Sequence, residues 1–148
     1  GASMILRREM LSQVGLLDED YFTYFEDMDL CKRVHHAGWG VWYVPQSKVI
    51  HLEGASSGIG HQIVKRRPEF WFQARRRYYL KHHGKFSAGV IDASYIIGFS
   101  LWRIRRLLQA KVDVDPPHML LDFIRNSVFF EGFRIPIVQT PAKRPSNE

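Results

Sequence analysis

The spacing of hydrophobic positions predicts two short helices in the first quarter of the chain. One is expected over residues 4–14 and ends at Gly15; the other is expected over residues 27–37 and ends at Gly38. Their apolar positions are Met4, Leu11 and Val14 in the first helix, and Leu30, Val34 and Ala37 in the second. The aromatic residues between the two helices are too dense for a solvated loop, so we expect them to pack.

A change to aromatic and β-branched residues then predicts two strands. WGVWYVP, residues 39–45, closes on a proline, and SKVIHL, residues 47–52, follows it. The glycine- and serine-rich run at 53–60 is expected to be a loop.

Helical periodicity returns at Pro68. Residues 68–84 open with proline, end on glycine and place Phe70, Trp71, Ala74 and Tyr78 on one face. A further helix is expected over 87–110; it carries Asp92, falls short of the ~20 apolar residues that a membrane span needs, and is interpreted as buried or interfacial. A last short helix is expected within 119–130, and residues 140–148 are expected to be a frayed tail.

Composition fits one folded domain with a basic surface. The chain has 148 residues, a formal net charge of +6 and a sequence pI near 9.7. A surface of this charge favours phosphates or anionic lipid. The single cysteine, Cys31, excludes an internal disulfide, and with no export leader in the sequence a cytoplasmic location is expected. The cations cluster at Lys65-Arg66-Arg67, Arg75-Arg76-Arg77, Arg103, Arg105 and Arg106.

Two acids at the expected start of the second helix are the first candidates for chemistry. Glu26 and Asp27 could cap the helix, since acids there satisfy free amides and complement the helix dipole. If burial between Phe25 and Met28 raised the pKa of one of them, it could instead act as a general base. The local pattern leaves both readings open.

Histidines are the second candidates. His51 follows an expected strand, where its imidazole could bind a divalent metal or be an ordinary polar side chain at a strand end. The pairs His35-His36 and His82-His83 are expected on the surface, because neighbouring helical residues point about 100° apart and cannot grip one ion.

Several motifs stand in order along residues 1–57: RREMLSQVG, then LLDEDYFTYFEDMDLCKR, then AGWGVWYVP and the histidine of VIHLEGASS. In this order they closely resemble the second half of the catalytic domain of family 2 glycosyltransferases, particularly the bacterial rhamnosyltransferase-like group. FWFQARRRYYLKHHG resembles the helical extension that often follows. The resemblance implies an α/β fold of the GT-A type and an inverting, metal-dependent transferase. Such an enzyme moves a sugar from a nucleotide-diphosphate donor to a cell-surface polysaccharide or lipid-linked glycan.

The resemblance also implies roles for individual residues. Asp27 takes the position of the general base that deprotonates the acceptor hydroxyl, and Glu26 shapes the acceptor site. His51 completes the coordination of the Mg²⁺ or Mn²⁺ that holds the donor diphosphate. Asp18 and Glu19 match loop acids of structural importance. The remaining residues expected on the acceptor side are Asp29, Arg33 and Trp39. Alternatively, Arg33 lies on a solvated face of its helix and binds no substrate.

The family's donor-binding half, with its Asp-x-Asp metal motif, has no counterpart in this sequence. We therefore expect a C-terminal fragment that is inactive alone, with the acceptor side at 1–60, a helical extension at 61–111, and a short helix and tail at 112–148. The fragment could form a homodimer over the apolar surface left by the missing half.

Non-catalytic functions remain as alternatives. Basic clusters beside Trp71, Tyr78 and Tyr79 would suit nucleic acid, although no recognisable nucleic-acid-binding signature accompanies them. A second alternative is a non-catalytic membrane adaptor in which the 87–110 helix docks on lipid and the basic helices lie on the anionic inner face of the membrane.

Overall fold

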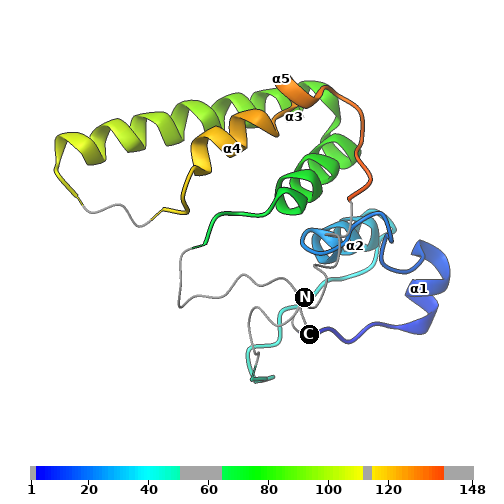
Figure 1. Cartoon of the computed structure of the whole chain (residues 1–148). Coiled ribbons are helices and arrows are strands. Elements are labelled where there is room, and N and C mark those ends of the chain that lie inside the picture. The colour runs from blue at the N-terminus through cyan, green and yellow to red at the C-terminus, as the bar shows by residue number, and fades with distance from the viewer. Residues whose placement is uncertain (1–2, 51–64, 112–114, 139–148) are drawn as a thin grey trace, which may run out of the picture.

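The computed structural model describes residues 3–50, 65–111 and 115–138, and five helices form within them (Figure 1). No strand forms in these residues. None of the helices in the described ranges combines the length and apolar character needed to cross a membrane. The helices are α1 (Arg8–Val14), α2 (Glu26–His36), α3 (Glu69–Leu108), α4 (Met119–Arg125) and α5 (Val128–Glu131).

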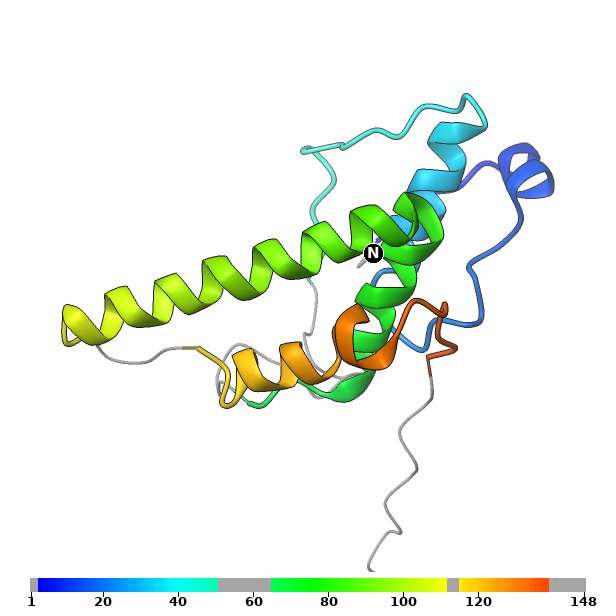
Figure 2. The ribbon, with the colours of Figure 1, turned by 90° about the horizontal axis from the view of Figure 1, so that it is seen from above.

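The long helix α3 organises the molecule. It bends at Gly84, whose φ of 75° and ψ of 175° lie outside the helical range, and a positive φ of this kind suits a residue without a Cβ. The half before the bend packs against α2, and α3 also contacts α4 and α5 (Figures 1 and 2). The two helices expected around Gly84 are thus confirmed, as two halves of one bent helix.

The first two helices pack together at one end of the molecule. α2 has almost its predicted bounds, whereas α1 begins only at Arg8 and leaves Met4 exposed. Met10 takes the place expected for Met4 and is buried with Leu30 and Val34 of α2.

A buried ion pair joins the two halves of α3 to α5. The Arg75 guanidinium contacts the Asp92 carboxylate at 2.5 Å, and the other Asp92 oxygen accepts the N–H of Val128 at 2.8 Å. Val128 is the first residue of α5, so Asp92 satisfies an amide that the helix itself cannot. The single helix expected over 119–130 is therefore two helices, separated at Ser127, whose backbone is extended.

The predicted strands at 39–45 and 47–52 are wrong as far as the described residues reach, because 39–50 form no β-structure. A strand is stable only when neighbouring strands satisfy its backbone groups and bury one of its faces. Nothing in the described residues does so here, since Trp42 is 86% exposed and Tyr43 89% exposed. The expected α/β class therefore stays a prediction.

The prediction that residues 75–77 form part of a basic surface is also wrong. Arg75, Arg76 and Arg77 are all buried. Their carboxylate partners are Asp92 for Arg75, Glu131 for Arg76, and both Asp18 and Asp20 for Arg77. The sequence predicted exposure from charge alone, but a buried arginine is stable when it is paired.

Candidate active site

Glu26 and Asp27 form the first turn of α2 and follow two residues in an unusual backbone conformation. Tyr24 and Phe25 have φ values of 67° and 66°, in the left-handed region that costs a residue with a Cβ about 1–2 kcal/mol. Strain of this kind persists only where surrounding contacts enforce it. The direction in which the two acids leave the loop is therefore fixed by the packing of Tyr24 and Phe25.

That packing comes from α3. The Phe70 ring lies 5.3 Å from Phe22 and 6.3 Å from Tyr24, centroid to centroid, and Phe25 lies 5.6 Å from Tyr78. Tyr21, Phe70, Ala74 and Val138 are the buried centre of this group. We call residues 21–25 the aromatic loop. The helical extension thus holds the loop that presents the two acids.

Asp27 is half-buried, and its carboxylate accepts the N–H of Met28 at 2.8 Å. Burial acts to raise the pKa of Asp27, and the hydrogen bond from the Met28 N–H acts to lower it. The raised pKa considered for an acid between Phe25 and Met28 therefore stays a prediction. The contact of Asp27 with a first-turn amide gives it part of a capping role.

Glu26 differs from Asp27 in having a buried carboxylate oxygen without a hydrogen-bond partner in the described residues. Its Oε2 is buried and accepts no hydrogen bond within the described part of the chain. A buried carboxylate oxygen without a donor is unfavourable. Glu26 can therefore accept a hydrogen bond from a hydroxyl group brought beside it.

Asp29 has a different environment, because it is fully buried and paired on both oxygens. One oxygen contacts Lys81 Nζ at 2.6 Å and His82 Nε2 at 2.7 Å, and the other accepts Arg33 Nε at 2.8 Å. Burial acts to raise the pKa of Asp29, but these partners hold it below its ordinary value. The surface position expected for His82 is wrong, since its side chain is 7% exposed.

The other residues expected on the acceptor side also make internal contacts. Arg33 donates to the carbonyl oxygens of Val14 and Leu16, so the solvated alternative for this residue is wrong. Trp39 donates from Nε1 to Gln13 Oε1 at 2.7 Å. These contacts tie α1 to α2; an acceptor-binding role for Asp29, Arg33 and Trp39 stays a prediction.

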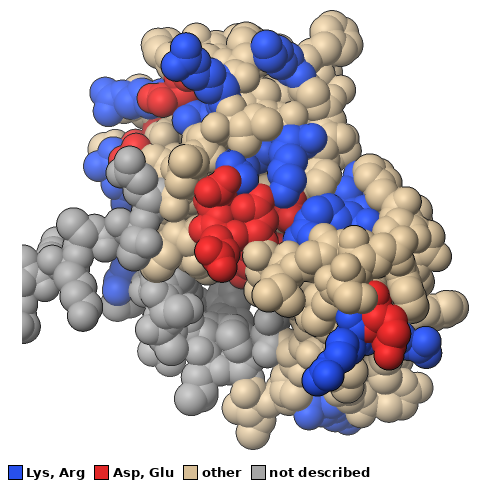
Figure 3. Space-filling model, turned by 90° about the vertical axis from the view of Figure 1, so that its right-hand side faces the viewer, with Lys and Arg blue, Asp and Glu red and all other residues tan. Residues whose placement is uncertain are grey.

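Asp18 has the structural role expected of the acids before the aromatic loop, whereas Glu19, for which the same role was expected, is exposed. Asp18 contacts Arg77 and Lys81, four residues apart on α3, at 2.9 Å and 2.7 Å. Acidic side chains gather on one face of the molecule with Lys and Arg beside them (Figure 3). We call Asp18, Asp29, Arg77, Lys81 and His82 the ionic network. Sequence reasoning overlooked its α3 members, although the i, i+4 spacing of Arg77 and Lys81 was a usable signal.

The expected metal ligand, His51, lies outside the described residues. Within the described ranges, no three His, Cys, Asp or Glu side chains are grouped so that they could hold a metal ion. These residues by themselves therefore do not form a metal centre.

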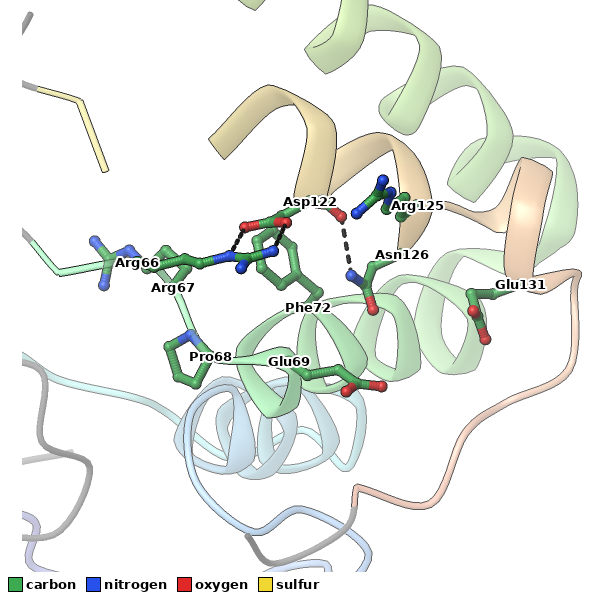
Figure 4. A pocket seen from close by; sticks show the side chains of 9 residues that line it. All are labelled: Arg66, Arg67, Pro68, Glu69, Phe72, Asp122, Arg125, Asn126 and Glu131. Atoms are coloured by element: carbon green, nitrogen blue, oxygen red, sulfur yellow. Dashed lines mark hydrogen bonds and ion pairs between the residues drawn. The ribbon is translucent and has the colours of Figure 1, made fainter. Parts of the chain in front are cut away.

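A separate polar cavity of about 520 Å³ lies between the start of α3 and the α4–α5 pair (Figure 4). Arg66 closes one side through two hydrogen bonds to Asp122, at 2.7 Å and 2.6 Å. Glu26 and Asp27 are not part of this cavity. Its lining residues are Arg66, Arg67, Pro68, Glu69, Phe72, Asp122, Arg125, Asn126 and Glu131.

Known proteins resemble part of the chain. It is 45% identical over 79 residues to the N-acetylglucosaminyl-diphospho-decaprenol L-rhamnosyltransferase of Mycobacterium tuberculosis. The matched segment covers 51% of this chain and 26% of that protein. It is 41% identical over 51 residues to the rhamnosyltransferase WbbL of Escherichia coli K12, covering 34% of this chain and 19% of WbbL. No family model matches the sequence, and no solved structure matches it.

These matches support a glycosyltransferase family for the matched part of the chain. The chain spans about a quarter of the length of the mycobacterial relative. The activity of a whole protein that contains it is therefore a proposal.

Replacing Asp29 by Asn tests its structural role. We expect the variant to lose about 2–3 kcal/mol of unfolding free energy at pH 7, because hydrogen bonds to a charged partner are lost. The wild type should lose stability as pH falls below the ordinary aspartate value of 3.8, toward the lowered folded pKa values of Asp18 and Asp29. Asp29→Asn should show a smaller loss, which urea unfolding at a series of pH values will measure.

Glu19→Gln is the matched control, because Glu19 is an exposed acid of the same segment. It should keep the wild-type stability and the wild-type pH dependence. Equal stability of Asp29→Asn and wild type at pH 7 would contradict a structural role for Asp29.

Proposed function

We propose that this chain is the acceptor-side part of an inverting, metal-dependent family 2 glycosyltransferase of the GT-A type. The parent enzyme transfers a sugar from a nucleotide-diphosphate donor to a bacterial cell-surface polysaccharide or a lipid-linked glycan. The observation that carries the proposal is the acid pair Glu26–Asp27, held at the start of α2 by the strained, packed residues Tyr24 and Phe25. The partial likeness to rhamnosyltransferases supports it.

In the proposed reaction, Asp27 acts on the acceptor. A general base acts as the ionised carboxylate, and the hydrogen bond from the Met28 N–H favours that form of Asp27. The acceptor hydroxyl oxygen forms a bond to the anomeric carbon while the bond from that carbon to the diphosphate breaks. The hydroxyl proton passes to Asp27, and the diphosphate leaves with the electron pair. Glu26 positions the acceptor through its unpaired Oε2.

The donor side belongs, in this proposal, to the remainder of the parent protein, and the isolated chain is inactive. The name of the mycobacterial relative specifies a rhamnosyl group and a diphospho-decaprenol acceptor. An activated rhamnose and a sugar linked to a polyprenyl diphosphate are therefore the substrates to assay first.

A nucleic-acid-binding module is not favoured. Its strongest sequence feature was the cluster at 75–77, whose side chains are buried and paired.

Asp27→Asn in the parent enzyme tests the base. We expect transfer to fall by about a thousandfold or more, because the proton acceptor is lost while the shape of the site is kept. Donor binding, measured by calorimetry, should not change. Glu26→Gln is the companion variant and should lower the rate less, since its amide oxygen still accepts a hydrogen bond. Asp27→Asn with more than about a tenth of the wild-type rate would refute the assignment.

The metal is a separate part of the proposal. We propose that His51 contributes to a Mg²⁺ or Mn²⁺ site in the parent enzyme, where the ion would neutralise the leaving diphosphate. His51→Ala should weaken metal-dependent donor binding by about tenfold or more, as measured by calorimetry at a series of metal concentrations. The exposed His36 provides the control, as His36→Ala. An unchanged metal dependence in His51→Ala would show that the imidazole binds no metal.

A further inference from the structure

The second half of α3 exposes an apolar surface that the transfer reaction does not use. Six apolar side chains repeat along it at helical spacing and fall within about 60° of the helix circumference, at 100° per residue. From first to last they cover about 33 Å of helix. All six are exposed, Phe86 by 86% and Leu108 by 83%. We call them the outer stripe; they are Phe86, Val90, Ile97, Leu101, Ile104 and Leu108.

The opposite side of the same helix half is already packed. Ala88 and Asp92 are buried. Tyr95 stacks on Phe123 of α4, and Phe99 packs against the cluster that contains Phe123. Figure 2 shows α4 along one side of this half of α3 only. The outer stripe is therefore a second apolar face, additional to the one that the fold needs.

The charged residues on the helix half that carries the stripe are nearly all cations, and the acid that follows it, Asp115, contacts Arg103 and Arg106. Between residues 85 and 111 the sole acid is Asp92, which is buried and paired with Arg75. The exposed charged residues include Lys85 at the beginning of the stripe, and Arg105 and Lys111 at its end. An apolar helical face with exposed cations at its borders suits a bilayer surface that contains anionic lipid.

A second copy of the chain fits the same surface less well. In a parallel pair of stripes each cation would face its own counterpart, and in an antiparallel pair Lys85 would face Arg105 or Lys111. Either arrangement places like charges together beside an apolar contact.

We propose that the outer stripe of α3 docks on an anionic lipid bilayer, with its apolar side chains in the interfacial region and its cations at the lipid headgroups. This goes beyond the proposed function, because no step of the transfer depends on it. It extends the lipid contact considered from the sequence for the 87–110 helix, because it names the face of that helix that meets the bilayer.

Flotation with vesicles tests the proposal. The 148-residue chain should float with vesicles of phosphatidylcholine and phosphatidylglycerol, and the bound fraction should fall on pure phosphatidylcholine or in high salt. Ile97→Glu combined with Leu101→Glu should reduce binding by about tenfold or more, because it places two anions in the stripe. Both residues are exposed, so the circular dichroism and the unfolding curve should stay near those of the wild type.

Leu16→Glu is the matched control, since Leu16 is exposed in the segment between α1 and α2. It adds an acid at a site outside the stripe and should bind vesicles nearly as well as the wild type. Arg105→Gln should lower only the salt-dependent part of binding.

Three results would overturn the proposal. They are an absence of wild-type flotation, equal flotation of the double variant and the wild type, and a wild-type dimer in sedimentation equilibrium that the double variant abolishes without vesicles. The last result would assign the stripe to a second copy. None of them bears on Asp27, which is tested by transfer in the parent enzyme.

Discussion

The packing of the aromatic loop on the first half of α3 is the contact on which the rest of the structure depends. The loop, residues 21–25, contains two consecutive residues with positive φ, and nothing in their own sequence favours that conformation. Phe70, Trp71 and Tyr78 supply the ring contacts that offset the strain. Because Glu26 and Asp27 follow directly, a helix more than forty residues away in sequence determines where these two acids lie.

The ionic network also holds the segment that contains the aromatic loop against α3. Asp18 and Asp29 come from the two ends of the segment that contains the loop, and both meet Lys81 of α3. Their carboxylates are stabilised as anions by the cations of α3, and burying those cations is tolerable only because the carboxylates are there. Aromatic packing and ion pairing thus fix α2 on α3 from two sides. In the proposed enzyme, the helical extension is part of the acceptor site's framework.

The helices could be predicted because their information is local. Apolar spacing and terminal glycines located α2 and both halves of α3, with Gly84 expected as a helix end where the structure has a bend. The strand prediction at 39–50 failed because a strand depends on partners, which local pattern does not contain. The candidate pair Glu26–Asp27 came from motif order. Its distinctive surroundings, the positive φ values and the unpaired Glu26 oxygen, could not be read from sequence, because they depend on contacts with α3.

The partners of the charged residues could not be predicted from the sequence either. Arg75, His82 and Asp29 were expected at a surface or a ligand site. Arg75 and Asp29 are buried in ion pairs, and the His82 ring is hydrogen-bonded to Asp29. Charge predicts exposure on average, but a buried cation requires one specific carboxylate, and the fold alone decides whether that carboxylate is near.

Amide hydrogen exchange in Phe70→Ala is the most direct test of the central claim that α3 fixes the start of α2. The backbone N–H of Asp29 donates to the Phe25 carbonyl at 2.8 Å, so it reports on the join between the loop and the helix. If the claim holds, exchange of the Met28, Asp29 and Leu30 amides should become faster by about tenfold or more, because the loop loses its main ring contact. The amides of α4 should keep their protection. Unchanged exchange at Asp29 in a folded Phe70→Ala variant would contradict the account.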